Sequence, residues 1–498
     1  MPFALAVAPI AMLTVAAIDF NRGTNARTSL QDSLDAAALV VGRSMVTDPA
    51  EVQSLGASAL AANLKLPPDT DLVSSEFILS GTEVHAKAKS KVKPLVTEMF
   101  AGDKLNVSVR THVRRGGDQL EIALVLDNTY SMVGSKLDLL KTAANNFVDK
   151  LQVAANQSLD PDPVKIALVP FSMTVNVGST YQNATWIDQA GVSPLNNEPF
   201  NAPVNRFTLF ANMGKTWGGC VESRQSPYDV QETAPTAGTP ATLFTPYFAV
   251  DEPDSRNKSN YQNGNFGTFY NDYLVDGVYS TSDWKIPQGA VAKYTGGVPT
   301  TGTNNTTHYQ YGPNAGCHLQ PVVRLTTNLA SVKTGITAMT AIGDTNVPMG
   351  LVWGWHALSP IGPFSDGSAY GAAKKKKIVV LMTDGQNSNA PNGNSNQSYY
   401  SGVGYIRHNR LGVGLGSSSA QRQAALDARL ATLCQNMKAA GKDIIIYTVR
   451  VEVNDQNFGT LKNCASSPAK FYDVQNASEL NGVFQQIADS IQNLRLAK

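Results

Sequence analysis

Four continuous apolar runs constrain the fold of this chain more than any other feature of its sequence. They are EIALVLD (121–127), VKIALVPFS (164–172), KKIVVLMTDG (376–385) and KDIIIYTVRVEV (442–453). Runs that are apolar at nearly every position are typical of strands that are buried on both faces of a parallel sheet. We therefore expect these four segments to form the centre of one sheet.

Helical patterns occupy the intervals between these runs. One begins near Ser135, and the others span about 327–340, 347–358, 420–440 and 476–495. A short FYDV strand (471–474) precedes the last helix. Strands that alternate with helices indicate an α/β fold, so the sequence predicts a doubly wound, mostly parallel sheet. Ligands bind such sheets at the carboxyl ends of the strands, where we expect the functional residues.

Two long insertions interrupt this alternation. Residues 173–323 are too many for a structureless loop in a compact domain, so we expect them to form a subdomain. Their aromatic residues form either the core of that subdomain or a partner-binding surface. These residues are Trp186, Trp217, Tyr228, Phe266, Tyr270, Tyr273, Tyr279, Trp284 and Tyr294. The second insertion, 386–419, is rich in Asn, Gly and Ser, which predicts a flexible lip over the site.

Residues with side-chain oxygens gather at three turns of the predicted fold. The turns are Asp127-Asn128-Thr129-Tyr130-Ser131, Gly343-Asp344-Thr345 and Thr383-Asp384-Gly385. The first and third directly follow predicted strands, and the second lies between two predicted helices. Two carboxylates and three hydroxyls can converge at one sheet edge, and such an all-oxygen, mostly neutral set suits a hard cation such as Mg²⁺.

The four cysteines are Cys220, Cys317, Cys434 and Cys464. None belongs to a C-x-x-C pair and no histidine stands at zinc-finger spacing beside them, which argues against a zinc site. An even number suits two disulfides in an oxidising compartment. Three pairings are possible. Sequence proximity favours Cys220–Cys317 with Cys434–Cys464, and four buried free thiols are the alternative.

The N-terminus begins with an uncharged apolar run. About 20 apolar residues span a bilayer, so residues 1–20 predict a transmembrane anchor, with a buried core helix as the alternative. No Lys or Arg precedes the run, unlike in a signal peptide, and we expect the natural chain to begin upstream.

Residues 21–116 predict a small pilin-like α+β unit. After the polar stretch Asp19–Asn25, apolar residues recur at intervals of three and four, as in an amphipathic helix. These residues are Leu30, Leu34, Ala37, Val41 and Met45. Strand-like alternation follows at Glu76–Leu79, Glu83–Ala88 and Leu105–Val113, around a helical stretch near Pro94–Phe100.

Charge and motif content exclude several functional classes. The formal net charge is +1, which gives no electrostatic reason to expect a nucleic-acid partner. The sequence contains neither a G-x-S-x-G elbow nor a G-x-x-x-x-G-K-[ST] loop, and none of its six histidines adjoins a nucleophile motif. We therefore expect a protein that is not an enzyme, with a metallohydrolase as the least favoured alternative.

The order D-x-[ST]-x-S, Thr loop, T-D-G resembles the metal-ion-dependent adhesion site (MIDAS) of von Willebrand factor A domains. The resemblance implies that Thr129, Ser131 and Thr345 offer hydroxyls to Mg²⁺ or Mn²⁺. Asp127 and Asp384 would lie close by or bind through water, and an acidic residue of a protein partner would complete the coordination.

Two features of the first loop differ from the usual pattern. Thr129 stands where Ser is usual and keeps the hydroxyl, and the bulky Tyr130 could narrow access to the site. A vestigial domain without a metal is the alternative. On this resemblance, residues 119–498 form a von Willebrand factor A domain with insertions 173–323 and 386–419.

Several further segments resemble TadG-like proteins of the tight-adherence system, which assembles Flp pili. They are the apolar N-terminus leading into SLQDSLDAAALV, then LDNTYSM, WGGCVESR, GPNAGC and FYDVQNASELNGVFQQIADSI. The resemblance implies a single-pass protein of the bacterial cell envelope, with its C-terminal domain outside the cytoplasm, that acts in pilus assembly or adhesion. A metal-free structural scaffold of the envelope is the alternative.

Overall fold

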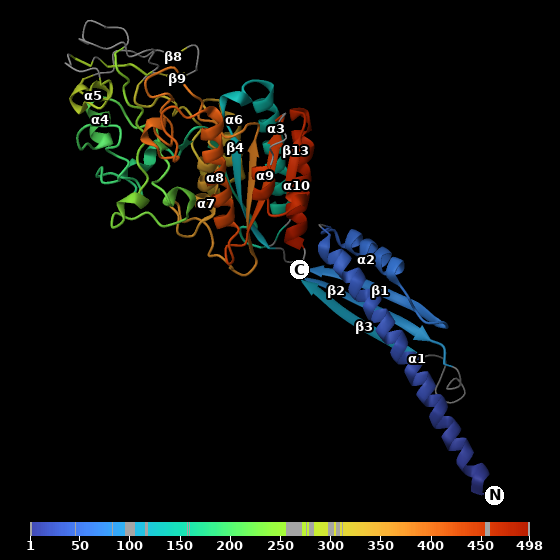
Figure 1. Ribbon diagram of the computed structural model, residues 1–498. Coiled ribbons are helices and arrows are strands. Elements are labelled where there is room, and N and C mark those ends of the chain that lie inside the picture. Colours follow the sequence, from blue (N-terminus) through green and yellow to red (C-terminus); the bar gives the residue numbers. More distant parts are fainter. Residues whose placement is uncertain are drawn as a thin grey trace. The chain divides into compact units, whose positions relative to one another are not determined.

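The computed structural model divides the chain into two compact units (Figure 1). The first comprises Met1–Gly117, Asn156–Pro161 and Leu496–Lys498, and the second comprises Asp118–Ala155 and Asp162–Arg495. The structure describes all residues except 1, 45, 82, 95–104, 115–117, 157, 159, 255–270, 275, 278–282, 297–302, 305–308, 311, 454–458 and 497–498.

The first unit packs two helices on an antiparallel sheet. Its elements are α1 (Pro2–Arg43), α2 (Pro49–Asn63), β1 (Thr70–Ser80), β2 (Glu83–Val92) and β3 (Leu105–Arg114), with strand order β1-β2-β3. The α1 residues Leu30, Leu34 and Val41 are buried against alternate residues of β2, such as Val84 and Ala86. The three strands and the amphipathic helix expected from the sequence are therefore present, whereas α2 was not anticipated.

Helix α1 is continuous through Asp19–Asn25, where the sequence suggested a polar break. This stretch contains one Gly and no Pro, so nothing in it forces the helix to end. Over the described residues, no helix contains a segment long and apolar enough to cross a bilayer. The helical stretch expected near 94–100 falls on residues 95–100, outside the described part of the chain.

The second unit contains a six-stranded sheet with strand order β10-β5-β4-β11-β12-β13. The strands are β4 (Gln119–Asp127), β5 (Val164–Phe171), β10 (Val323–Thr326), β11 (Lys375–Thr383), β12 (Ile444–Val451) and β13 (Phe471–Val474). All neighbouring pairs are parallel except β10–β5. The mostly parallel α/β sheet is thus confirmed. The antiparallel edge strand β10 was not predicted, because its four residues are too few to carry a pattern.

Two hydrophobic cores cover the two faces of this sheet. Along β4, Ile122 and Leu124 join the core that contains α3 (Ser135–Asn156), α6 (Leu329–Ala338) and α10 (Leu480–Leu496). Ala123 and Val125 face the other core, which contains α7 (Val347–Leu358), α8 (Ser419–Met437) and α9 (Gly459–Cys464). Every residue of α7 is buried, because the helix lies between the sheet and the inserted segments.

The insertions pack against each other beyond α7, where the green, yellow and orange segments of Figure 1 lie side by side. Their regular elements are short: α4 (Arg206–Asn212), α5 (Lys285–Gln288), β6 (Val175–Asn176), β7 (Cys220–Val221), β8 (Thr303–Asn304) and β9 (Tyr309–Gln310). The expectation of a flexible lip at 386–419 is wrong. Tyr400 and Asn394 are buried, the Tyr247 hydroxyl donates to the Tyr400 carbonyl at 2.9 Å, and Asn394 Nδ2 donates to Glu252 Oε1 at 2.9 Å.

Aromatic side chains form much of the core of the inserted segments. Trp186, Trp217, Tyr273 and Tyr294 are buried there, whereas Phe266, Tyr270 and Tyr279 lie outside the described residues. Both disulfides favoured by sequence proximity are present. Cys220–Cys317 joins β7 to the end of the first insertion, and Cys434–Cys464 joins α8 to α9.

Candidate metal site

Asp127 links the carboxyl ends of β4 and β11. Its Oδ1 accepts a hydrogen bond from the Thr129 amide at 2.8 Å, and its Oδ2 accepts one from the Thr383 hydroxyl at 2.6 Å. The residue has no exposed surface. Burial, followed by the negative charge of Asp384, raises the pKa of Asp127 to about 6, although the hydrogen bonds from Thr129 and Thr383 act in the opposite direction. The two carboxylates therefore lie close enough to influence each other.

The hydroxyls of the first loop connect it to Asp384. Thr129 Oγ1 lies 2.9 Å from Ser131 Oγ, and Ser131 Oγ donates to Asp384 Oδ1 at 2.7 Å. The Asp384 side chain is fully buried, whereas Ser131 is exposed at the surface. The exposed Ser131 thus joins two buried side chains, the Thr129 hydroxyl and the Asp384 carboxylate.

The third loop brings Thr345 to the same place. Gly343 adopts a φ of +74°, a left-handed turn that favours glycine, and its carbonyl accepts from the Tyr130 amide at 3.0 Å. A Cβ added to Gly385 would lie 3.2 Å from Thr345 Oγ1 and 3.9 Å from Ser131 Oγ. The hydroxyls of Thr345 and Ser131 therefore both lie beside Gly385. All five residues predicted for the metal site therefore lie in one cluster.

The donor set of this cluster consists of three hydroxyls and two carboxylates. Hard divalent cations prefer oxygen ligands, and Mg²⁺ takes few direct carboxylates, so the residues fit such an ion. Within the described part of the chain, no group of three or more His, Cys, Asp or Glu side chains is arranged to hold a metal ion. The oxygen cluster is of a different kind, because hydroxyls make up most of its donors.

Two residues that matter to the site were missed in the sequence. The sequence predicts no role for Thr383 beyond its place in the T-D-G turn, yet its hydroxyl donates a hydrogen bond to Asp127. Lys136 lies in the first turn of α3, and its Nζ is 2.5 Å from Asp384 Oδ2. No sequence signal marked Lys136, because a lysine on an amphipathic helix usually faces solvent.

Apolar side chains border the exposed side of the cluster. Tyr130, directly before Ser131, is 46% exposed, and Val133, two residues after Ser131, is 53% exposed. Asp344 lies next to Thr345, and burial raises the pKa of Asp344 to about 6 despite a hydrogen bond from the Ala390 amide. The surface around Ser131 therefore combines exposed apolar groups with buried carboxylates.

The solved structures to which this chain is similar have low sequence identity to it. The chain is similar to the von Willebrand factor domain of the type V pili tip protein Mfa5 from Porphyromonas gingivalis, with 11% identity and a TM-score of 0.34 over 75% of this chain and 95% of that one. It is similar to the pilus adhesin SpaC from Lactobacillus rhamnosus GG, with 11% identity and a TM-score of 0.34 over 86% of this chain and 35% of that one.

A third similar structure is proximal thread matrix protein 1 from the mussel byssus, solved with a zinc-occupied MIDAS motif. The identity is 12% and the TM-score 0.27, over 76% of this chain and 46% of that one. The chain thus spans about a third of the length of SpaC and less than half of the thread matrix protein. No curated protein matches the chain.

A family model matches the N-terminal part of the chain. Residues 1–44, which include α1, match the model of the Tad family, described as Flp pilus-assembly TadE/G-like. The match covers the apolar run and the amphipathic segment on which the resemblance to TadG-like proteins partly depended. The N-terminal 44 residues are therefore similar to the TadE/G-like model of Flp pilus assembly, which agrees with the resemblance noted in the sequence.

Proposed function

We propose that the second unit is a doubly wound von Willebrand factor A domain whose oxygen cluster holds Mg²⁺ or Mn²⁺ and binds a carboxylate of a protein partner. Thr129, Ser131 and Thr345 would contact the ion, with Asp127 and Asp384 beside it or joined to it through water. The observation that carries this proposal is the convergence of hydroxyls from two separate loops around the buried Asp384.

The bound ion would supply positive charge at the surface, which attracts an anionic group of the partner. The chain's own residues prepare the place for it. Thr383 and the Thr129 amide hold the Asp127 carboxylate, and the hydroxyl of the exposed Ser131 donates to Asp384. The exposed Tyr130 and Val133 would contact apolar groups that neighbour the partner's carboxylate.

We assign this domain to an envelope protein that takes part in Flp pilus assembly or adhesion. Its residues 1–20 would anchor it as a single pass, residues 21–116 would form a pilin-like unit, and the C-terminal domain would lie outside the cytoplasm. Two observations support this placement. Residues 1–44 match the Tad family model, and the two disulfides are of the kind that persists in oxidising compartments.

A second candidate function is a metal-free structural scaffold of the envelope. The contact between Lys136 and Asp384 favours it, because the ammonium group already balances the charge of this buried carboxylate. A metallohydrolase is less favoured. Asp127, whose pKa is raised, is enclosed by hydrogen bonds from Thr129 and Thr383 and is not free to act as a general base.

Titration calorimetry of the full-length chain with Mg²⁺ and Mn²⁺ tests the proposal. Thr345→Val removes a hydroxyl at nearly constant shape, whereas Thr345→Ser retains it. We expect saturable binding to the wild type and to Thr345→Ser, and affinity lower by roughly tenfold or more in Thr345→Val. Asp149→Asn is the charge control, because Asp149 lies on α3 and pairs with Lys333 at the surface.

Two results would contradict the proposal. Equal affinity of Thr345→Val and the wild type would show that an ion binds elsewhere. Absence of saturable binding of either ion, to the wild type and to all variants, would favour the metal-free scaffold.

A further inference from the structure

Lys136 brings a positive charge to the candidate metal site. Its Nζ lies 2.5 Å from Asp384 Oδ2, while the other oxygen of this carboxylate accepts from the Ser131 hydroxyl at 2.7 Å. The Asp384 side chain has no exposed surface, and that of Lys136 is 25% exposed. Asp384 is therefore shared between a cation of the chain itself and a hydroxyl that belongs to the proposed metal ligands.

A second carboxylate, that of Glu452, lies near the same lysine. Glu452 Oε2 lies 3.8 Å from Lys136 Nζ, beyond the contact with Asp384. Glu452 is held in place, because its Oε1 accepts from the Ala477 amide at 2.8 Å and its own amide donates to the Val474 carbonyl at 2.8 Å. It also adopts a φ of +51°, a left-handed conformation that is uncommon for a residue other than glycine.

The two carboxylates of the site need positive charge whether or not a metal is bound. Buried Asp127 and Asp384 lie near each other, and an uncompensated pair of this kind is unfavourable. Lys136 supplies one charge to Asp384. A divalent ion at the neighbouring hydroxyls supplies two, and it would then lie close to the lysine, which it repels.

We propose that Lys136 is a built-in cation that occupies Asp384 when the site holds no metal and moves to Glu452 when a divalent ion binds. This inference rests on the proposed function. Lys136 and the metal then compete for Asp384, so the lysine weakens metal binding and stabilises the metal-free domain. Glu452 has the opposite effect on affinity, because it gives the displaced ammonium group a partner.

The test compares Mg²⁺ and Mn²⁺ affinities and thermal melting of the full-length chain. Lys136→Met should bind either ion more tightly than the wild type, on the order of tenfold, the usual size of coupling between two sites. The metal-free form of Lys136→Met should melt at a lower temperature than the metal-free wild type. Saturating metal should raise the melting temperature of Lys136→Met by more than it raises that of the wild type. Lys141→Met is the matched control, since it removes a lysine from the same helix.

Glu452→Gln completes a double-mutant cycle. Alone it should weaken metal binding several-fold, whereas in the Lys136→Met background it should have little effect, because no displaced lysine remains to be received. A lysine that merely packs on the helix would not produce this non-additivity.

The outcomes separate the inference from the proposed function. Tighter binding by Lys136→Met supports the inference, even if the wild type itself binds too weakly to detect. Saturable wild-type binding with equal or weaker binding by Lys136→Met overturns the inference and leaves the proposed function intact. If no protein of the series binds either ion, both are overturned.

Discussion

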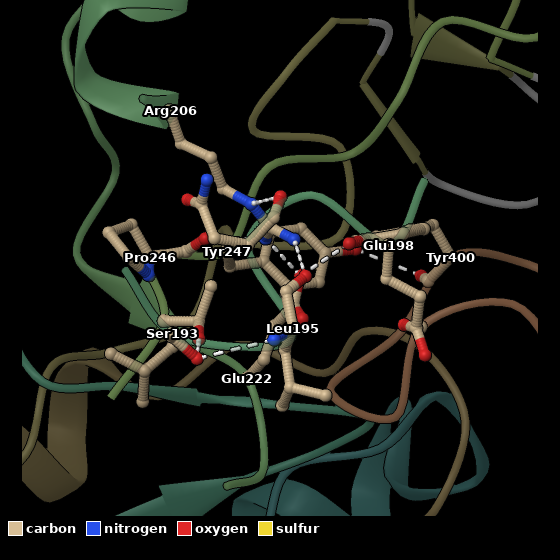
Figure 2. Close-up of polar contacts among 12 residues, drawn as sticks. Ser193, Leu195, Glu198, Arg206, Glu222, Pro246, Tyr247 and Tyr400 are labelled. Atoms are coloured by element: carbon tan, nitrogen blue, oxygen red, sulfur yellow. Dashed lines mark hydrogen bonds and ion pairs between the residues drawn. The ribbon is translucent and has the colours of Figure 1, made fainter. Parts of the chain in front are cut away.

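A buried carboxylate ties the two insertions together, and its neutralisation should destabilise the second unit. Glu222 Oε1 accepts from Arg206 Nη1 and from the Tyr400 hydroxyl (Figure 2). Glu222 Oε2 accepts from Arg410 Nη1 at 2.8 Å. The Glu222 and Arg206 side chains have no exposed surface. Glu222→Gln keeps the size of the side chain but leaves two buried guanidinium groups without this counter-charge.

The expected loss follows from these contacts. Removing one member of a buried ion pair costs about 3–5 kcal/mol, because the remaining charge stays buried without its partner. We expect the loss to fall in this range because Arg206, Tyr400 and Arg410 all donate hydrogen bonds to Glu222. Equilibrium unfolding in urea, followed by tryptophan fluorescence, measures the loss as a shift of the midpoint at unchanged slope.

Asp149→Asn is the control for this experiment. Asp149 pairs with Lys333 in an ion pair whose two side chains are 53% and 39% exposed, so its loss should cost no more than about 1 kcal/mol. If Glu222→Gln costs as little as Asp149→Asn, the reasoning is refuted, and the insertions do not depend on this network for their packing.

Three further predictions concern the packing, a crosslink and the acid stability of the second unit. Gly350→Ala places a Cβ against a phenylalanine ring of β5 and should cost about 1–3 kcal/mol of unfolding free energy, whereas Gly482→Ala meets nothing within 4 Å and should stabilise α10 by up to about 1 kcal/mol in the same urea assay. Replacing both cysteines of the α8–α9 disulfide by Ser should cost about 3–4 kcal/mol, because their sequence separation is 30 residues; a loss below 1 kcal/mol would contradict this. Burial acts to raise the pKa of Glu198, but the hydrogen bond from His408 and the charge of Arg410 outweigh it and lower the pKa to about 2. The stabilisation that ionised Glu198 contributes is therefore fully present above pH 4.5, and about 3 kcal/mol of it is lost as the pH falls toward 2. In Glu198→Gln the urea midpoint should depend less on pH between 4.5 and 2 than it does in the wild type.

The sheet was predictable because its signal is local. β4, β5, β11 and β12 are buried on both faces, so each is a continuous apolar run that can be read without knowing its neighbours. The short edge strand β10 has no such run, and only its pairing with β5 makes it a strand. Proximity in the sequence favoured the disulfide pairing that the structure shows.

The insertion 386–419 was misjudged because burial of polar residues depends on partners far away in the chain. Asn, Gly and Ser favour flexible loops when they stand alone. Here the amide of Asn394 meets Glu252, and the hydroxyl of Tyr400 meets Glu222, across 142 and 178 residues of sequence. The polar composition therefore reflects a hydrogen-bonded interior rather than a mobile surface.

The sequence by itself determined the α/β class, the four central strands, the amphipathic N-terminal helix and the five oxygen-bearing residues of the candidate site. These features are periodic patterns or short motifs, and backbone geometry translates them directly into structure. Only the tertiary structure decided that Lys136 reaches Asp384 and that Thr383 holds Asp127. Such contacts join residues that are about 250 positions apart, and they form because folding places three chain segments at one edge of the sheet.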